Sequence, residues 1–213
     1  CNEAFMTLMF YMTPGSCSTG IHILLEELEL PFEVTVLNLP AGDHRRPDYL
    51  ALNPKGSIPA LRLDDGRVLT EFQAIAYWLA CRHPRARLLP SDPLLAALAI
   101  ELMDHVVGTV HGQGYTRIFT TDSYLPPGLE PAQRMHWQQA IAERGREIVS
   151  LGFEIIDGRL SDEGYAAGSD FSIALTSSSV RLDKKPPSFG MFPFSRGSTP
   201  ETSGLLRLSI KTF

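Results

Sequence analysis

The sequence has 213 residues, of which 44% are hydrophobic and 20% are charged, proportions that are typical of a globular protein with a sizeable core. Its formal net charge of -5 argues against a nucleic-acid partner or an anionic membrane surface. No apolar run approaches the roughly 20 residues that a membrane-spanning helix needs, and the N-terminus lacks the pattern of a signal peptide.

The first part of the chain predicts a small mixed sheet with helices. Apolar alternation indicates strands, apolar spacing of three and four indicates helices, and a Pro-Gly and an Asp-Gly pair indicate turns. The expected strands cover residues 7–11, 32–36, 60–63 and 67–69, and the expected helices cover residues 16–29, 48–52 and 70–81. Ser16 and Ser18 are both candidates for the N-cap of the first helix. Two strand–helix units are thus closed by a hairpin and a final helix.

The remainder of the chain predicts an all-α domain followed by a segment of different composition. We expect a domain over 6–83, a linker rich in Pro and charge over 84–93, an all-α domain over 94–174, and an atypical tail over 175–213. Long amphipathic runs cover Leu94–Val110 and Pro131–Arg159. The 39 residues of the tail hold twelve Ser or Thr and four Pro, and six basic and two acidic residues give it a charge of +4.

Cys17 lies at the expected start of the first helix, in the stretch TPGSCSTG. Unpaired backbone N–H groups and the helix dipole favour a thiolate there. Such a thiol suits a nucleophile, a redox group or a contact for a bound thiol, and a small residue in the first helical turn is the alternative. No second cysteine stands at CxxC spacing, so a dithiol oxidoreductase is not expected. Three cysteines cannot form a disulfide framework, so we expect a cytoplasmic protein.

Two features near the middle of the chain suit an extended peptide ligand. Ile58-Pro59 begins an expected strand, where proline is awkward unless its peptide bond is cis or Ile58 turns its backbone outward. An outward backbone offers N–H and C=O to a peptide, whereas an ordinary loop proline is the alternative. Glu71 begins the next helix, where it either complements the dipole or accepts a ligand ammonium group beside the amide of Phe72.

The histidines do not predict a metal site. His105 and His111 are six residues apart on one expected helix and therefore lie on different faces, and the remaining histidines show no ligand spacing either. The sequence also has no phosphate-binding glycine loop and no nucleophile elbow.

Four segments carry a family resemblance: FYMTPGSCS, NPKGSIPALRLDDGRVLTEFQAIAYWLA, IELMDHVVGTVHGQGYTRIF and GYAAGSDFSIA. The second is highly specific, because it joins a strand-entering proline, a hairpin and a Glu-bearing helix at fixed spacing. From about Met6 to Ala174, the sequence resembles the cytosolic glutathione transferases of the bacterial beta class. The resemblance implies an α/β thioredoxin-like N-terminal domain, an all-α C-terminal domain, a cytoplasmic homodimer, glutathione as co-substrate without a metal, and a role in detoxification.

The resemblance also implies roles for individual residues. The catalytic candidates are Cys17, Ser16 and His111, and the glutathione-binding candidates are Tyr11, Ile58, Pro59, Glu71, Phe72 and Asp104. Cys17 would contact the glutathione sulfur and could form a mixed disulfide with it. Ile58 would bond to the cysteinyl backbone, next to Pro59 as the cis-proline of the family. Glu71 and Phe72 would bind the γ-glutamyl end.

Some positions depart from the family pattern. Phe72 stands where Ser, Gly or Ala is usual, so a hydroxyl contact to the ligand is lost. Asp104 replaces an Asn on the first long C-terminal helix, from which it and His111 would reach the active site. The basic residue expected in the loop over 39–49 has Arg45 and His44 as its nearest candidates.

The resemblance implies that the chain conjugates glutathione thiolate to small electrophilic substrates. Thiol transfer through a Cys17 mixed disulfide is one alternative, and a non-catalytic glutathione-binding or damaged family member is another. In the family, an Asp takes the position of Leu175 and an apolar helix follows it. We therefore hypothesise that the residues from about 175 onward are a frameshifted or foreign C-terminus.

Overall fold

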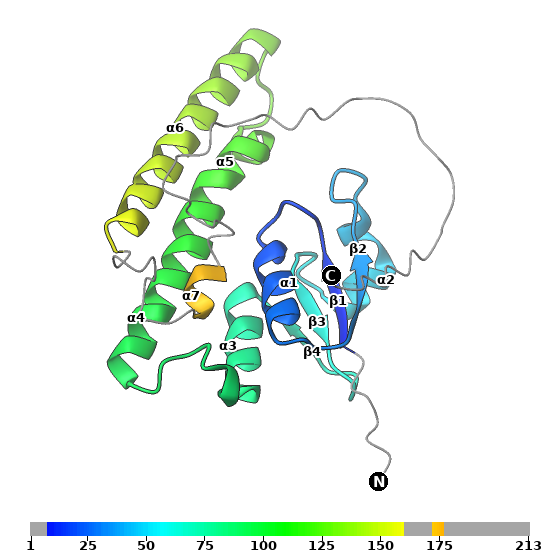
Figure 1. The fold of residues 1–213 in the computed structure, drawn as a ribbon. Helices are drawn as coiled ribbons and strands as arrows, with labels where there is room; N and C mark the ends of the chain where they lie inside the picture. The colour runs from blue at the N-terminus through cyan, green and yellow to red at the C-terminus, as the bar shows by residue number, and fades with distance from the viewer. Residues whose placement is uncertain (1–7, 160–171, 177–213) are drawn as a thin grey trace, which may run out of the picture. The chain divides into compact units, whose positions relative to one another are not determined.

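Four strands form a mixed sheet with the order β2-β1-β3-β4 (Figure 1). The strands are β1 (Leu8–Met12), β2 (Phe32–Val36), β3 (Ala60–Arg62) and β4 (Val68–Thr70). Strand β1 pairs in parallel with β2 and antiparallel with β3, and β3 pairs antiparallel with β4. This arrangement confirms the predicted small mixed sheet. The structure, a computed structural model, describes residues 8–159 and 172–176.

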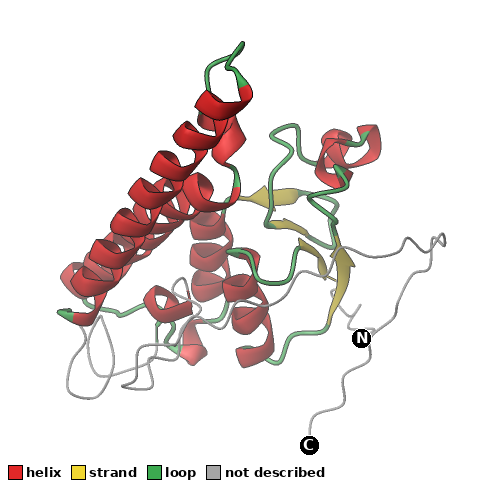
Figure 2. Ribbon diagram, turned by 90° about the horizontal axis from the view of Figure 1, so that it is seen from above, coloured by secondary structure: helices red, strands yellow, loops and turns green. Residues whose placement is uncertain are grey.

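The two faces of the sheet are covered by different helices. The helices of this part are α1 (Ser18–Glu27), the 3-10 turn η1 (Asp43–Arg45), α2 (Pro47–Leu52) and α3 (Phe72–Arg82). Leu8, Phe10 and Met12 alternate along β1 and are buried in a core shared with α1 and α3. Tyr11 belongs to the other face, where its ring lies 5.8 Å from that of Tyr49 in α2. Figure 2 shows the strands between α2 and the other helices.

Buried apolar side chains fix the positions of α1 and α3. Ile21 of α1 and Ile75 of α3 are both fully buried in the core on β1. Burying such a side chain contributes about 1.5–3 kcal/mol. The first turns of both helices are therefore held firmly, and these turns carry Cys17 and Glu71.

The second part of the described chain is helical. Its elements are the 3-10 turn η2 (Pro84–Ala86), α4 (Pro93–Asp104), the π-helix η3 (His105–Tyr115), α5 (Thr116–Phe119), the 3-10 turn η4 (Thr121–Tyr124), α6 (Pro131–Asp157) and α7 (Ile173–Thr176). Because α4, η3 and α5 follow one another without a break, the predicted helix Leu94–Val110 continues to Phe119. Its side chains Val106 and Val110 share a second core with α6 and α7.

The continuous helical run Pro93–Phe119 corrects the expectation that no segment reaches membrane-spanning length. It has 27 residues, and its most apolar window has a mean hydropathy of 1.5, so by length and composition alone it is long and apolar enough to cross a membrane. Glu101 and Asp104 interrupt the apolar run in the sequence, but the mean hydropathy of the window stays high because its other residues are mostly apolar. Ala99, Leu102 and Val106 of the same run are buried in the second core.

The domain limits at residues 83, 93 and 174 stay predictions. The hypothesis of a frameshifted C-terminus concerns residues that, beyond 176, lie outside the described part of the chain.

Candidate functional site

Cys17 occupies the N-cap position of α1, so the prediction of Ser16 or Ser18 as the cap was wrong. The two serine hydroxyls instead serve the preceding turn. Ser16 Oγ lies 2.6 Å from Ser18 Oγ and 2.7 Å from the carbonyl oxygen of Thr13. Ser18 Oγ donates to the same carbonyl at 3.1 Å. These contacts fix the backbone on both sides of Cys17.

The thiol of Cys17 faces the backbone at the start of β3. Cys17 Sγ donates to the carbonyl oxygen of Ile58 at 3.8 Å. The Ile58-Pro59 peptide bond is cis, which confirms the expected cis-proline. The thiol at the start of α1 and the backbone before β3 are therefore neighbours, although 41 residues separate them in the sequence.

The environment of Cys17 favours the neutral thiol. The pKa of Cys17 is raised from 9.0 to about 11, mainly by burial and to a smaller extent by the Glu71 carboxylate. The backbone N–H groups of Cys17 and Ser18 lower this pKa, as the helix start predicts, but their effect is smaller than that of desolvation. The expectation of a favoured thiolate was therefore wrong. At neutral pH, Cys17 is a hydrogen-bond donor.

We expect Cys17 to react slowly with iodoacetamide. A pKa of about 11 in place of 9.0 gives about a 100-fold lower thiolate fraction below pH 9, and only the thiolate reacts. Mass spectrometry of a Cys1→Ser/Cys81→Ser variant measures this rate between pH 6 and 11. A Cys1→Ser/Cys17→Ser variant, which keeps the exposed Cys81, controls for the reagent. A Cys17 rate that reaches its plateau by pH 9 would contradict the raised pKa.

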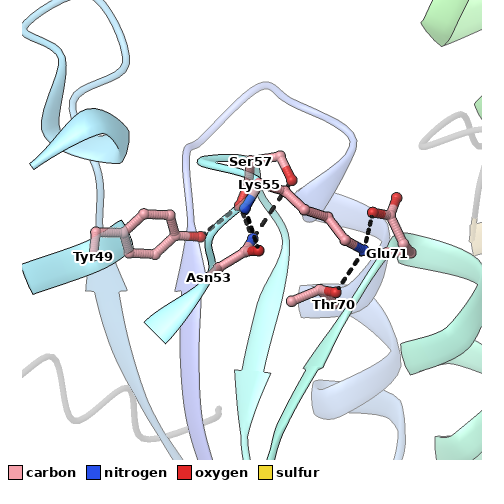
Figure 3. A network of polar contacts seen from close by, with 6 residues as sticks. All are labelled: Tyr49, Asn53, Lys55, Ser57, Thr70 and Glu71. Carbon is pink, nitrogen blue, oxygen red and sulfur yellow. Dashed lines mark hydrogen bonds and ion pairs between the residues drawn. The ribbon is translucent and has the colours of Figure 1, made fainter. Parts of the chain in front are cut away.

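Two buried side chains fix the loop between α2 and β3 (Figure 3). The Tyr49 hydroxyl and the Asn53 amide both donate to the carbonyl oxygen of Ser57, the amide at 2.8 Å. Asn53 Oδ1 also accepts the backbone N–H of Lys55 at 3.2 Å. Tyr49 and Asn53 are only 5% and 1% exposed, so two buried side chains hold the backbone that leads into Ile58.

Arg45 lies over the same loop. Gly56 has a φ of +59°, and a Cβ added there would lie 3.0 Å from both Arg45 Nη1 and the carbonyl oxygen of His44. Glycine is therefore required at this position, both for its backbone angle and for its lack of a side chain. Of the two basic candidates, the guanidinium of Arg45 is the group that the structure brings to this loop.

Glu71 is the N-cap residue of α3 and has an unusual backbone, with φ 72° and ψ 129°. Its Oε1 lies 2.6 Å from Lys55 Nζ, which also donates to Thr70 Oγ1 at 3.0 Å (Figure 3). The Glu71 side chain makes no capping hydrogen bond to the first turn of α3. Phe72 is 2% exposed and its ring belongs to the core, so this residue can offer a ligand only its backbone N–H.

Asp104 and His111 lie on the helical part of the chain. Asp104 Oδ1 accepts a hydrogen bond from Gln73 Nε2 at 2.8 Å, which joins the end of α4 to the first turn of α3. Burial lowers the pKa of His111, whose ring packs edge-on against Tyr115 at 6.2 Å. Within residues 8–159 and 172–176, no hydrogen bond or ring contact links His111 to Cys17.

The structure thus places Cys17 beside Ile58, which precedes the cis-proline Pro59, and joins Asp104 to the helix that Glu71 begins. Sequence reasoning missed Lys55 and Gln73. Both lie inside the specific motif, but their partners could not be read from spacing. Among the described residues, no group of three or more His, Cys, Asp or Glu could hold a metal ion.

Comparison with known proteins gives the family. The model for the glutathione S-transferase N-terminal domain matches residues 15–82. The glutathione S-transferase GstA of Escherichia coli O157:H7 is 33% identical over 172 residues, covering 78% of this chain and 76% of the relative. A glutathione transferase homologue from Sulfitobacter, solved with bound glutathione, has a TM-score of 0.71 and 29% identity and covers 80% of this chain and 78% of its own. The bacterial beta class enzyme of Sphingomonas chungbukensis has a TM-score of 0.63 and 29% identity over 79% and 78% of the two chains. The chain therefore belongs to the glutathione S-transferase family and has its thioredoxin-like sheet and helical C-terminal region.

Proposed function

We propose that this chain conjugates the thiolate of glutathione to small electrophilic substrates. Glutathione would lie extended along Ile58-Pro59, with its γ-glutamyl end at Glu71 and the N–H of Phe72. Its sulfur would lie at the start of α1, beside Cys17 and Ser16. The observation that supports this most is the 3.8 Å contact between Cys17 Sγ and the Ile58 carbonyl, because one cysteinyl residue of a ligand can then reach both groups.

The raised pKa of Cys17 favours a supporting role for this thiol. A neutral thiol can donate a hydrogen bond to the glutathione thiolate and lower the pKa of the glutathione thiol. The thiolate then attacks an electrophilic carbon, so that a C–S bond forms and the leaving group departs with its electron pair. Thiol transfer instead needs Cys17 itself as the nucleophile, and its pKa makes this second function less favourable.

Further parts of the proposal concern the remaining site residues and the assembly. Tyr11 and Asp104 stay candidates for contacts with glutathione, and His111 stays a candidate catalytic residue near the electrophile. We also propose a cytoplasmic homodimer. Leu94 is 68% exposed in the single chain, and Leu95 and Leu98 on the same helix are exposed too, which supports an apolar surface that a second copy would cover.

Titration calorimetry with glutathione and the full chain tests the proposal, together with conjugation to 1-chloro-2,4-dinitrobenzene. We expect saturable binding and conjugation. Saturable binding without conjugation of any electrophile in a panel would favour a non-catalytic glutathione-binding protein. The absence of saturable binding would overturn the proposal and favour the damaged family member.

We expect the Cys17→Ala variant to lower conjugation by about 10- to 150-fold, because a hydrogen bond from the thiol to the charged thiolate contributes about 1.5–3 kcal/mol. The same variant should lose any reduction of glutathione mixed disulfides, since that reaction needs a thiol on the protein. Steady-state rates of both reactions measure this, with Cys81→Ala as the control. A loss of conjugation of about 1000-fold or more exceeds the effect of one hydrogen bond and would contradict the supporting role of Cys17.

A further inference from the structure

The ion pair between Lys55 and Glu71 joins the loop before the cis-proline to the start of α3. Lys55 Nζ lies 2.6 Å from Glu71 Oε1 and 3.0 Å from Thr70 Oγ1 (Figure 3). An ammonium group has three N–H donors and a carboxylate has two oxygens. Among the described residues, the third donor of Lys55 and Oε2 of Glu71 make no hydrogen bond or ion pair.

Stability alone does not account for this ion pair. The two side chains are 53% and 60% exposed, and exposed ion pairs contribute about 0–1 kcal/mol. Ordering a lysine side chain costs up to about 2 kcal/mol in rotamer entropy. The backbone of Lys55 is nevertheless held in place, because its N–H donates to the buried Asn53 and Gly56 follows with a positive φ. The loop therefore aims the ammonium group at Glu71.

The pair leaves one anionic acceptor and one cationic donor side by side. An α-amino acid group presents the complementary set, an ammonium and a carboxylate on one carbon. Its ammonium group would bind Glu71 Oε2, and its carboxylate would bind the third donor of Lys55. Phe72 adds only a backbone N–H to this set, because its ring is buried in the core. The charge for the carboxylate therefore has to come from another residue.

We propose that Lys55 is a specificity-determining residue that binds the α-carboxylate of the γ-glutamyl group. This role rests on the proposed binding of glutathione. Lys55 and Glu71 together then select ligands that carry both charges of the α-amino acid group. A ligand that lacks the α-carboxylate loses the contact with Lys55 and leaves two ammonium groups around one carboxylate.

Calorimetry with two peptides tests this role. One peptide is glutathione, and the other is its analogue in which hydrogen replaces the α-carboxylate. We expect Lys55→Met to weaken the binding of glutathione about tenfold, which is the effect of one lost charge-assisted hydrogen bond at an exposed position. The same variant should bind the analogue as the unchanged chain does, within about twofold, or more tightly. Lys55→Arg should restore selectivity.

Arg67→Met is the matched control. It removes one positive charge from the β3–β4 hairpin, where Arg67 pairs with Asp65, and it should change neither affinity. If Lys55→Met weakens both peptides equally, the lysine only supports the fold of the loop and the proposal is overturned. A tighter binding of glutathione would also overturn it, because Lys55 would then compete with the ligand for Glu71. An unchanged chain that binds neither peptide overturns the proposed function and this role with it.

Discussion

Replacing Glu71 by Ala is expected to weaken the binding of glutathione by about 30- to 150-fold. The variant removes the carboxylate that we propose as the acceptor for the ligand ammonium group, and a hydrogen bond to a charged group contributes about 2–3 kcal/mol. Titration calorimetry measures the change. Asp64→Ala removes an exposed carboxylate from the nearby hairpin turn and should leave the affinity unchanged.

Replacing Glu71 by Gly separates the binding role of this residue from its backbone. With φ 72° and ψ 129°, Glu71 holds a conformation that costs a residue with a side chain about 1–2 kcal/mol and costs glycine little. We therefore expect the Gly variant to lose as much affinity as the Ala variant, but to exceed it in free energy of unfolding by about 1 kcal/mol. Urea denaturation gives this difference. A Gly variant less stable than the Ala variant would mean that the backbone angle carries no strain.

The segment NPKGSIPALRLDDGRVLTEF shows how much of the site the sequence could predict. Asp-Gly at a turn and Glu at a helix start have a local physical meaning, so the hairpin and the position of Glu71 could be predicted. The cis bond at Pro59 was implied only by the family resemblance, because the residues alone also allow an ordinary loop proline. The partners of these residues could not be predicted. Whether Lys55 points at Glu71 depends on the hydrogen bonds that Asn53 and Tyr49 make with the backbone of this loop, which no spacing rule contains.

The pKa of Cys17 is a second case in which local and tertiary effects oppose each other. The helix start could be read from the sequence, and its backbone N–H groups do lower the pKa. The burial of the thiol against the Ile58 backbone depends on contacts across 41 residues, and it raises the pKa by more than the helix lowers it. A local rule gave the correct sign for one effect and the wrong sign for the net result.

The long helical run from α4 to α5 was predicted too short for a reason that lies in its glycines. Gly108, Gly112 and Gly114 weaken a helix locally, so the amphipathic pattern ends near Gly112 in the sequence. In the structure, Gly114 lies against α6, and a Cβ added to it would lie 2.6 Å from Cγ2 of Val149. The lack of a side chain, which lowers helix propensity, is what allows the two helices to pack closely.

The same contact predicts a large loss of stability when Gly145 of α6 is replaced by Val. A Cβ at Gly145 would lie 2.8 Å from the carbonyl oxygen of Gly114 and 2.9 Å from Cβ of Arg117. Because a backbone oxygen cannot rotate away, the helices must separate along the second core, and overpacking of this kind costs about 1–3 kcal/mol. We expect the Val variant to lower the free energy of unfolding by about 2–3 kcal/mol in urea denaturation.

Gly158→Val is the matched control for this prediction. Gly158 ends the same helix with φ -66°, and its added Cβ would come no closer than 3.5 Å to another atom. This variant makes the same chemical change without moving a helix, so its free energy of unfolding should change by about 0.5 kcal/mol or less. If both variants are equally stable, the close approach of α6 to η3 does not limit the side chain at position 145. If only the Gly145 variant is destabilised, the close contact of Gly145 with the backbone of Gly114 is what excludes a side chain at position 145.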